Sequence, residues 1–133
     1  MTRAEAEAFA VDWAAAWNEG AIERVLAHFD DAVVFRSPTA LAVVGVGTLR
    51  GKEALRAYWV AAMGRLKSLR FTVDRVLWDP ATQELAIVYV SEIDGNAKRV
   101  SENLRFGPRN RVVAAEVFHG VAGDQCDLTE NRC

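Results

Sequence analysis

The chain has 133 residues, of which 51% are hydrophobic and 26% are charged, and its formal net charge is −2. This length suits one domain with one core, and the balanced charge gives no electrostatic footprint for nucleic acid. No apolar run approaches the roughly 20 residues that cross a bilayer, and the N-terminus lacks the apolar segment of a secretory signal, so we expect a cytoplasmic protein without membrane contact.

The N-terminal half of the sequence predicts three helices. Thr2 and Glu5 match a capping box, so a first helix should cover residues 3–19. Apolar residues at helical spacing predict a shorter second helix over residues 22–29 and a third over residues 52–63. The helices should therefore each present one apolar face to a common core.

The rest of the sequence predicts mainly strands. A short strand is expected at residues 32–35, and residues 42–44 could form another. Four longer strands follow, joined by turn sequences such as Asp94-Gly95: residues 69–78, 84–93, 97–106 and 111–119. Helices first and a strand meander second indicate an α+β architecture, with helices on one face of a curved, mostly antiparallel sheet.

A single domain over residues 1–120 accounts for these elements, and we expect residues 121–133 to form a flexible tail. Cys126 and Cys133 both lie in that tail. They do not form a disulfide framework, and no His or Cys stands near them at zinc-ligand spacing. We expect two tail thiols, or a disulfide that closes only a short loop.

The row Val100, Glu102, Leu104 and Phe106 places a carboxylate on the apolar face of a strand. An unpaired carboxylate in apolar surroundings is costly, so Glu102 must have a partner or face a cavity. A two-residue turn at Asp94-Gly95 would place Glu102 opposite Ile87, and a four-residue loop at residues 107–110 would place it opposite Ala115.

The opposite face of the sheet mixes apolar and charged residues. Val88, Val90 and Phe118 share it with Arg99 and Glu116, which would lie near enough to pair across or around this surface. Because fully solvated sheet faces rarely carry such apolar groups together, we expect this face to contact a second subunit in a homodimer.

The order of several short motifs resembles the nuclear transport factor two superfamily, and its SnoaL-like and ketosteroid-isomerase-like branches most of all. The resemblance covers roughly residues 5–120 and rests on these strings: Trp17-Asn18-Glu19-Gly20, Val25 to Phe35, Ser37-Pro38, Gly51 to Leu55, and Tyr58. It implies a conical α+β barrel, in which three helices close a curved sheet over a deep apolar pocket. Homodimers that form through the outer sheet face are common in this superfamily.

The superfamily contains isomerases, cyclases, hydrolases, dehydratases and non-enzymatic modules, so the fold alone does not fix the chemistry. The positions that carry Tyr, Asp and an acid in ketosteroid isomerases correspond here to Trp13, Ser37 and Glu102. Only the last retains a carboxyl group, so steroid isomerisation by that mechanism is not expected.

Glu102 is therefore the main candidate for a general acid or base, since apolar surroundings raise the pKa of a carboxyl. Without chemistry, it would be a carboxylate hydrogen-bonded to a Trp or Tyr. His119, which lies in phase with Glu102, is a second candidate for a catalytic role, but the expected register separates the two by on the order of 13 Å. Residues that could line a ligand cavity, or simply form the core, are Trp13, Trp17, Ser37, Tyr58, Trp59, Phe71 and Tyr89.

Three functional interpretations follow from the sequence. The first is a small enzyme that acts on a compact hydrophobic substrate through Glu102. The second is a pocket that binds a small apolar molecule without reaction, and the third is a dimeric interaction module. Because metal, nucleotide and phosphate-binding motifs are absent from the sequence, we expect no cofactor.

Overall fold

The structure is a computed structural model that describes residues 1–122. Within this range there are four α-helices and six strands, and the last four strands follow one another along the chain. Their bounds are α1 Arg3–Asn18, α2 Ile22–Leu26, β1 Phe29–Arg36, α3 Pro38–Val44, β2 Thr48–Arg50, α4 Lys52–Met63, β3 Leu69–Asp79, β4 Glu84–Ile93, β5 Asn96–Phe106 and β6 Val112–Ala122. A 3₁₀ turn, Pro108–Asn110, joins β5 to β6.

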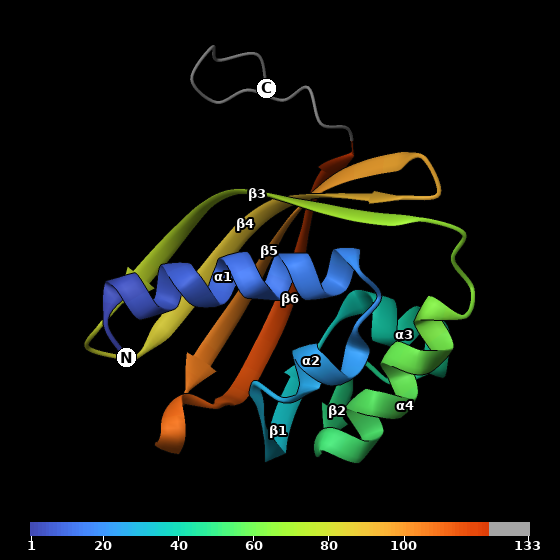
Figure 1. Ribbon diagram of the computed structural model, residues 1–133. Coiled ribbons are helices and arrows are strands. Elements are labelled where there is room, and N and C mark those ends of the chain that lie inside the picture. The colour runs from blue at the N-terminus through green and yellow to red at the C-terminus, as the bar shows by residue number, and fades with distance from the viewer. Residues whose placement is uncertain (123–133) are drawn as a thin grey trace.

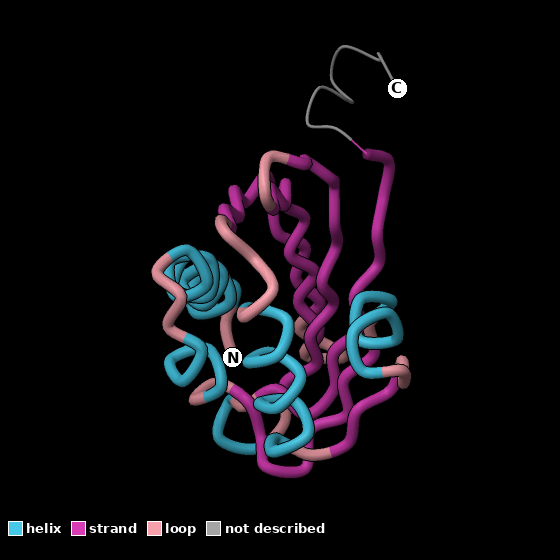
Figure 2. The backbone as a smooth tube through the Cα atoms, turned by 90° about the vertical axis from the view of Figure 1, so that its right-hand side faces the viewer, coloured by secondary structure: helices cyan, strands magenta, loops and turns pink. Residues whose placement is uncertain are grey.

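The six strands form one mixed sheet in the order β2-β1-β6-β5-β4-β3. Strand β1 runs parallel to β6, and the other neighbours are antiparallel. The sheet stays open, and α1 crosses the face of its long strands while α2, α3 and α4 gather near β1 and β2 (Figure 1). Seen end-on, α1 lies to one side of the strands (Figure 2). The α+β fold with a curved, mostly antiparallel sheet is confirmed.

Helix α1 begins where the sequence predicts. The Thr2 side chain accepts a hydrogen bond from the Glu5 backbone N–H, and the Glu5 carboxylate accepts one from the Thr2 backbone N–H. The helix buries Phe9, Trp13 and Trp17 against the sheet. These three aromatic residues, one on each of three successive turns, anchor α1 to the sheet.

Two predictions about the N-terminal half are wrong. Residues 38–44 form the helix α3 and no strand: Pro38 is its first residue, and the Ser37 hydroxyl accepts a hydrogen bond from the Thr39 backbone N–H. Residues 1–122 therefore contain four α-helices where we expected three. The second helix ends at Leu26, and Phe29 starts β1, where it pairs with Val112 of β6 and its side chain is fully buried.

The strand meander is close to the prediction. The register of β4 on β5 matches throughout, with Ile87 opposite Glu102, and β3 shifts register between Val73 and Arg75, where an irregularity was expected. Strand β6 continues through Ala122, so residues 120–122 belong to the sheet. The remainder of the predicted tail, with both cysteines, lies outside the described residues.

The register of β5 on β6 differs from the prediction by two residues. Glu102 lies opposite Val117, where we expected Ala115, and Val100 lies opposite His119. The turn takes up the difference, because Arg109 and Asn110 both have positive φ and the register shifts again next to Arg105. A shift of two residues preserves the alternation, so the same side chains still face the helices.

Within one chain, Arg99 and Glu116 do not pair. Arg99 makes an ion pair with Asp74 of β3, with a distance of 2.7 Å between Nη2 and Oδ2. Glu116 lies opposite Asn103, four residues further along β5 from Arg99. The two charges are thus separated along the sheet by about 13 Å.

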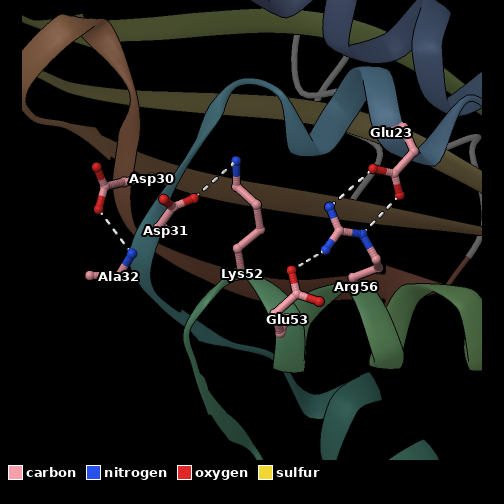
Figure 3. Close-up of polar contacts among 7 residues, drawn as sticks. All are labelled: Glu23, Asp30, Asp31, Ala32, Lys52, Glu53 and Arg56. Carbon is pink, nitrogen blue, oxygen red and sulfur yellow. Dashed lines mark hydrogen bonds and ion pairs between the residues drawn. The ribbon is translucent and has the colours of Figure 1, made fainter.

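Helix α4 is fixed through its polar side. Arg56 donates to both carboxylate oxygens of Glu23 in α2, at 2.9 and 3.0 Å, and it also bonds Glu53 (Figure 3). Lys52 lies 3.6 Å from Asp31 of β1. With its charged side engaged by α2 and β1, the helix turns Leu55, Tyr58 and Trp59 toward the core. No helix within residues 1–122 is long and apolar enough to cross a bilayer.

Candidate functional site

A cavity of about 560 Å³ lies between the helices and the concave face of the sheet. This volume is within the range of small-molecule sites. Its aromatic wall comprises Trp17, Phe35, Tyr58, Trp59, Phe71 and Tyr89. Polar residues on the wall are Ser37, Thr39, Ser91, Asn96, Lys98, Glu102 and His119.

Glu102 is the buried acid of this cavity. Its place in β5, between Ile87 of β4 and Val117 of β6, puts it in the middle of the sheet. Only 6% of the residue is exposed, and its Oε2 has no hydrogen-bond partner. Burial raises the pKa of this carboxyl to about 8, while the neighbouring Trp13 opposes the shift. The group is therefore mostly protonated at pH 7 and can donate a proton.

Two tyrosines surround the acid. Burial raises the pKa of the Tyr89 hydroxyl well above its usual value, and the Glu102 and Tyr58 charges act in the same direction. Burial also raises the pKa of Tyr58, partly offset by the Ser37 hydroxyl. Both phenols stay neutral at pH 7 and provide O–H groups near the carboxyl of Glu102.

His119 lies closer to Glu102 than the sequence suggested. It sits opposite Val100, and residues diagonal to each other across two strands are about 7–8 Å apart. The expected separation on the order of 13 Å is therefore wrong, because it assumed that Glu102 pairs with Ala115 and not with Val117. Both residues line the same cavity, with His119 in an exposed position.

The rim of the cavity is formed by His119, Thr39 and Lys98. The sequence analysis did not single out the last two. His119 Nε2 lies 3.5 Å from Thr39 Oγ1, and its Nδ1 lies 3.5 Å from Lys98 Nζ. Burial, and then the Lys98 charge, lower the pKa of His119. Lys98 could have been found by alternation, since it shares a strand face with Val100 and Glu102. Thr39 was missed because we did not predict the helix that carries it.

Most of the predicted ligand-binding residues lie on the cavity wall: Trp17, Ser37, Tyr58, Trp59, Phe71 and Tyr89. Trp13 does not, because it is fully buried beside Glu102, stacked on Phe71 with ring centroids 5.5 Å apart. Its indole Nε1 has no hydrogen-bond partner of normal geometry. Trp13 is thus a neighbour of the Glu102 carboxyl that does not itself line the cavity.

Residues 1–122 contain no group of three or more acidic or histidine side chains that could hold a metal ion. The donors around the cavity are dispersed hydroxyl, indole and amine groups.

The chain belongs to the SnoaL-like domain family, whose model matches residues 10–123. It is similar to a SnoaL-like protein of unknown function from Burkholderia thailandensis, with 31% identity over 90% of this chain and 98% of that chain and a TM-score of 0.81. No curated protein matches the sequence.

Two more distant structures share the fold. SalBIII, an epoxide hydrolase/cyclase-like enzyme with a role in pyran ring formation in salinomycin, has 14% identity over 88% of this chain and 92% of that chain, with a TM-score of 0.70. A protein with a ketosteroid isomerase-like fold from Catenulispora acidiphila, in complex with trimethylamine, has 16% identity over 85% of each chain and a TM-score of 0.65.

The ionisation of Glu102 can be measured directly. We expect its carboxyl to titrate near pH 8 in the folded protein, because burial disfavours the charged form. The measurement is an NMR titration of the Glu side-chain carbons, with Glu102→Gln to assign the signal. A value near 4.3, which is ordinary for an exposed Glu, would contradict the buried placement.

Proposed function

We propose that this SnoaL-like protein is a small enzyme that binds a hydrophobic molecule in the cavity and acts on it by acid–base chemistry. The reaction would be of the isomerase, cyclase or hydrolase type. The observation that carries the proposal is the buried Glu102, whose unpartnered carboxyl lies on the wall of a cavity of about 560 Å³. A protonated acid in such a place is typical of catalytic sites.

In the proposed step, Glu102 donates its proton to an oxygen atom of the bound molecule, such as a carbonyl or epoxide oxygen. The O–H bond breaks, its electron pair stays on the carboxylate, and a proton from the reacting molecule or from water later restores the acid. The neighbouring Trp13 favours the charged form and would stabilise this carboxylate. Tyr58 and Tyr89 provide hydroxyls that orient the molecule.

The fold is compatible with an enzyme, but it does not determine the reaction. SalBIII shares the fold and is described as an epoxide hydrolase/cyclase-like enzyme. The cavity of the present chain has one buried acid, and Ser37 occupies the position of the second acid in ketosteroid isomerases. The function is therefore proposed from Glu102 and its surroundings, and the reaction need not be that of an isomerase.

A binding role without reaction is the second candidate. It is favoured by Ser37, which is buried and caps α3 instead of supplying a base. In that case the aromatic wall alone would hold the molecule, as in many hydrophobic carrier sites.

Glu102→Gln separates the two candidates, because it keeps the shape of the side chain and removes its proton. For an enzyme, we expect turnover to fall by about 100-fold or more with nearly unchanged ligand affinity. The measurement is turnover on a substrate found by screening small carbonyl compounds, epoxides and terpenoids.

Tyr58→Ala is the companion variant, since it removes part of the aromatic wall. Weaker binding in Tyr58→Ala together with full function in Glu102→Gln would support the binding role. Full turnover in Glu102→Gln would remove Glu102 as the catalytic group. If no screened compound binds, the protein fits an interaction module better than either role.

We also propose that the chain forms a homodimer through the outer face of the sheet. Val88 and Val90 are half-buried there, and Phe118 is 49% exposed. Covering such a face with a second copy would remove this apolar surface from water. Sedimentation at micromolar concentration should give about twice the monomer mass, and Phe118→Lys should lower it. A species of 14.6 kDa alone would contradict the dimer.

A further inference from the structure

The cavity has two ends of different chemistry. Its inner end is aromatic and holds Glu102, which is neutral at pH 7. Its rim holds Lys98, His119 and Thr39. Lys98 and Glu102 lie on the same face of β5 four residues apart, so their Cα atoms are separated by about 13 Å. A ligand that reaches both ends would be about as long as two fused rings with a substituent.

The two rim contacts of His119 fit one tautomer of the neutral imidazole. The ammonium group of Lys98 has only donors, so His119 Nδ1 must be the acceptor in this contact. The imidazole is then the neutral form with its proton on Nε2, which points to the Thr39 hydroxyl. The lowered pKa of His119 agrees with this assignment. A neutral His119 leaves the charge of the neighbouring Lys98 unneutralised.

The positive charge of Lys98 has no acidic counterpart in the described part of the chain. Within residues 1–122, the ion pairs shorter than 4.0 Å do not include Lys98. Asp94 lies on the adjacent hairpin, but its Oδ1 accepts hydrogen bonds from the Lys67 and Ser68 backbone N–H groups, at 2.7 and 2.9 Å. With Glu102 neutral, the cavity wall carries a net positive charge.

We infer that the molecule bound in this cavity is an amphipathic acid, whose anionic group lies at the rim against Lys98 and Thr39 while its apolar body fills the aromatic end. An ammonium group and a hydroxyl are suitable donors for a carboxylate. A hydrophobic molecule without charge would fill the apolar part of the cavity but make no use of the Lys98 ammonium at its mouth. This inference rests on the proposal that the cavity binds a hydrophobic molecule, and it adds the class of that molecule and a residue that selects it.

Two fluorescent dyes with the same skeleton test the inference. 8-Anilinonaphthalene-1-sulfonate carries an anionic group, and N-phenyl-1-naphthylamine is the same molecule without it. We expect Lys98→Met to weaken binding of the sulfonate about fivefold and to leave the affinity for the neutral dye within about twofold. The affinities follow from fluorescence titration, and raising the salt concentration should weaken only the binding of the sulfonate.

Lys67→Met is the matched control, because Lys67 is exposed and contributes only its backbone to the contact with Asp94. Its two affinities should be those of the wild-type protein. If Lys98→Met leaves the ratio of the two affinities unchanged, or if Lys67→Met lowers the sulfonate affinity equally, the anionic subsite is overturned.

A third variant distinguishes this failure from failure of the proposed function. Ala62 lines the cavity from α4, and Ala62→Trp should fill part of it and weaken binding of both dyes. If both dyes bind Ala62→Trp as tightly as wild-type protein, with the melting temperature unchanged, the cavity is not the binding site and both proposals fail. If only the neutral dye responds to Ala62→Trp, the cavity binds apolar molecules and the anionic subsite alone is overturned.

Discussion

Raising the pH from 4.5 to 8 is expected to destabilise the wild-type protein by about 4 kcal/mol relative to the Glu102→Gln variant. The folded state holds the Glu102 proton up to a pKa of about 8, whereas the model value for an exposed Glu is 4.5. Below pH 4.5 the carboxyl is protonated in both states, and its contribution to stability is fully present. Above it, only the unfolded state releases the proton, so stability is lost progressively up to the folded pKa.

The measurement is urea denaturation of both proteins at several pH values in this interval. Glu116→Gln is the matched control, since Glu116 is an exposed glutamate on the neighbouring strand β6. Its free energy of unfolding should follow that of the wild-type protein at every pH. Parallel curves for wild type and Glu102→Gln would show that Glu102 ionises as readily in the folded state as in the unfolded one.

The burial of Glu102 was predictable because it needs only local information. Alternation along β5 places it with Val100 and Leu104, and the turn Asp94-Gly95 fixes β5 against β4. A two-residue turn leaves one choice of register, and Asp94 and Gly95 both take the positive φ that such a turn requires. A strand pattern and a short turn were therefore enough to place the main candidate residue.

The position of His119 was not predictable in the same way. The connection between β5 and β6 contains a 3₁₀ turn with Arg109 at φ 60° and Asn110 at φ 53°. Neither is a glycine, so the sequence did not indicate that the turn departs from a simple four-residue loop. The resulting shift of two residues kept His119 on the cavity face but halved its distance from Glu102 along the strand.

The rim of the cavity depended on α3, which the sequence did signal. Ser37 followed by Pro38 is a common start of a helix, and Gly45, with φ 82°, is a common end. The apolar residues between them suggested a strand because the segment is short. Because we did not predict α3, we also did not predict that Thr39 lies next to His119. Short helices next to a cavity are thus weakly determined by periodicity alone.

Trp13→Ala is expected to lower the free energy of unfolding by about 3 to 5 kcal/mol. Trp13 is fully buried, stacks on Phe71 of β3, and meets Tyr89 of β4 edge-on with ring centroids 5.0 Å apart. Its removal would leave a cavity at the point where α1 contacts the sheet. Urea denaturation at pH 6 measures the loss. Val11→Ala on the same helix is the control: Val11 is 71% exposed, and its loss should change stability by less than about 0.5 kcal/mol.

Trp13→Phe separates the packing of this residue from its effect on Glu102. Phenylalanine retains much of the aromatic volume but has no N–H, so the interaction that favours the charged carboxyl is lost while the burial remains. The variant should therefore lose less stability than Trp13→Ala, and the pKa of Glu102 should rise further above its wild-type value in the NMR titration. An unchanged Glu102 pKa in a folded Trp13→Phe protein would mean that Trp13 only packs. The carboxylate left by the proposed proton transfer would then lack this support.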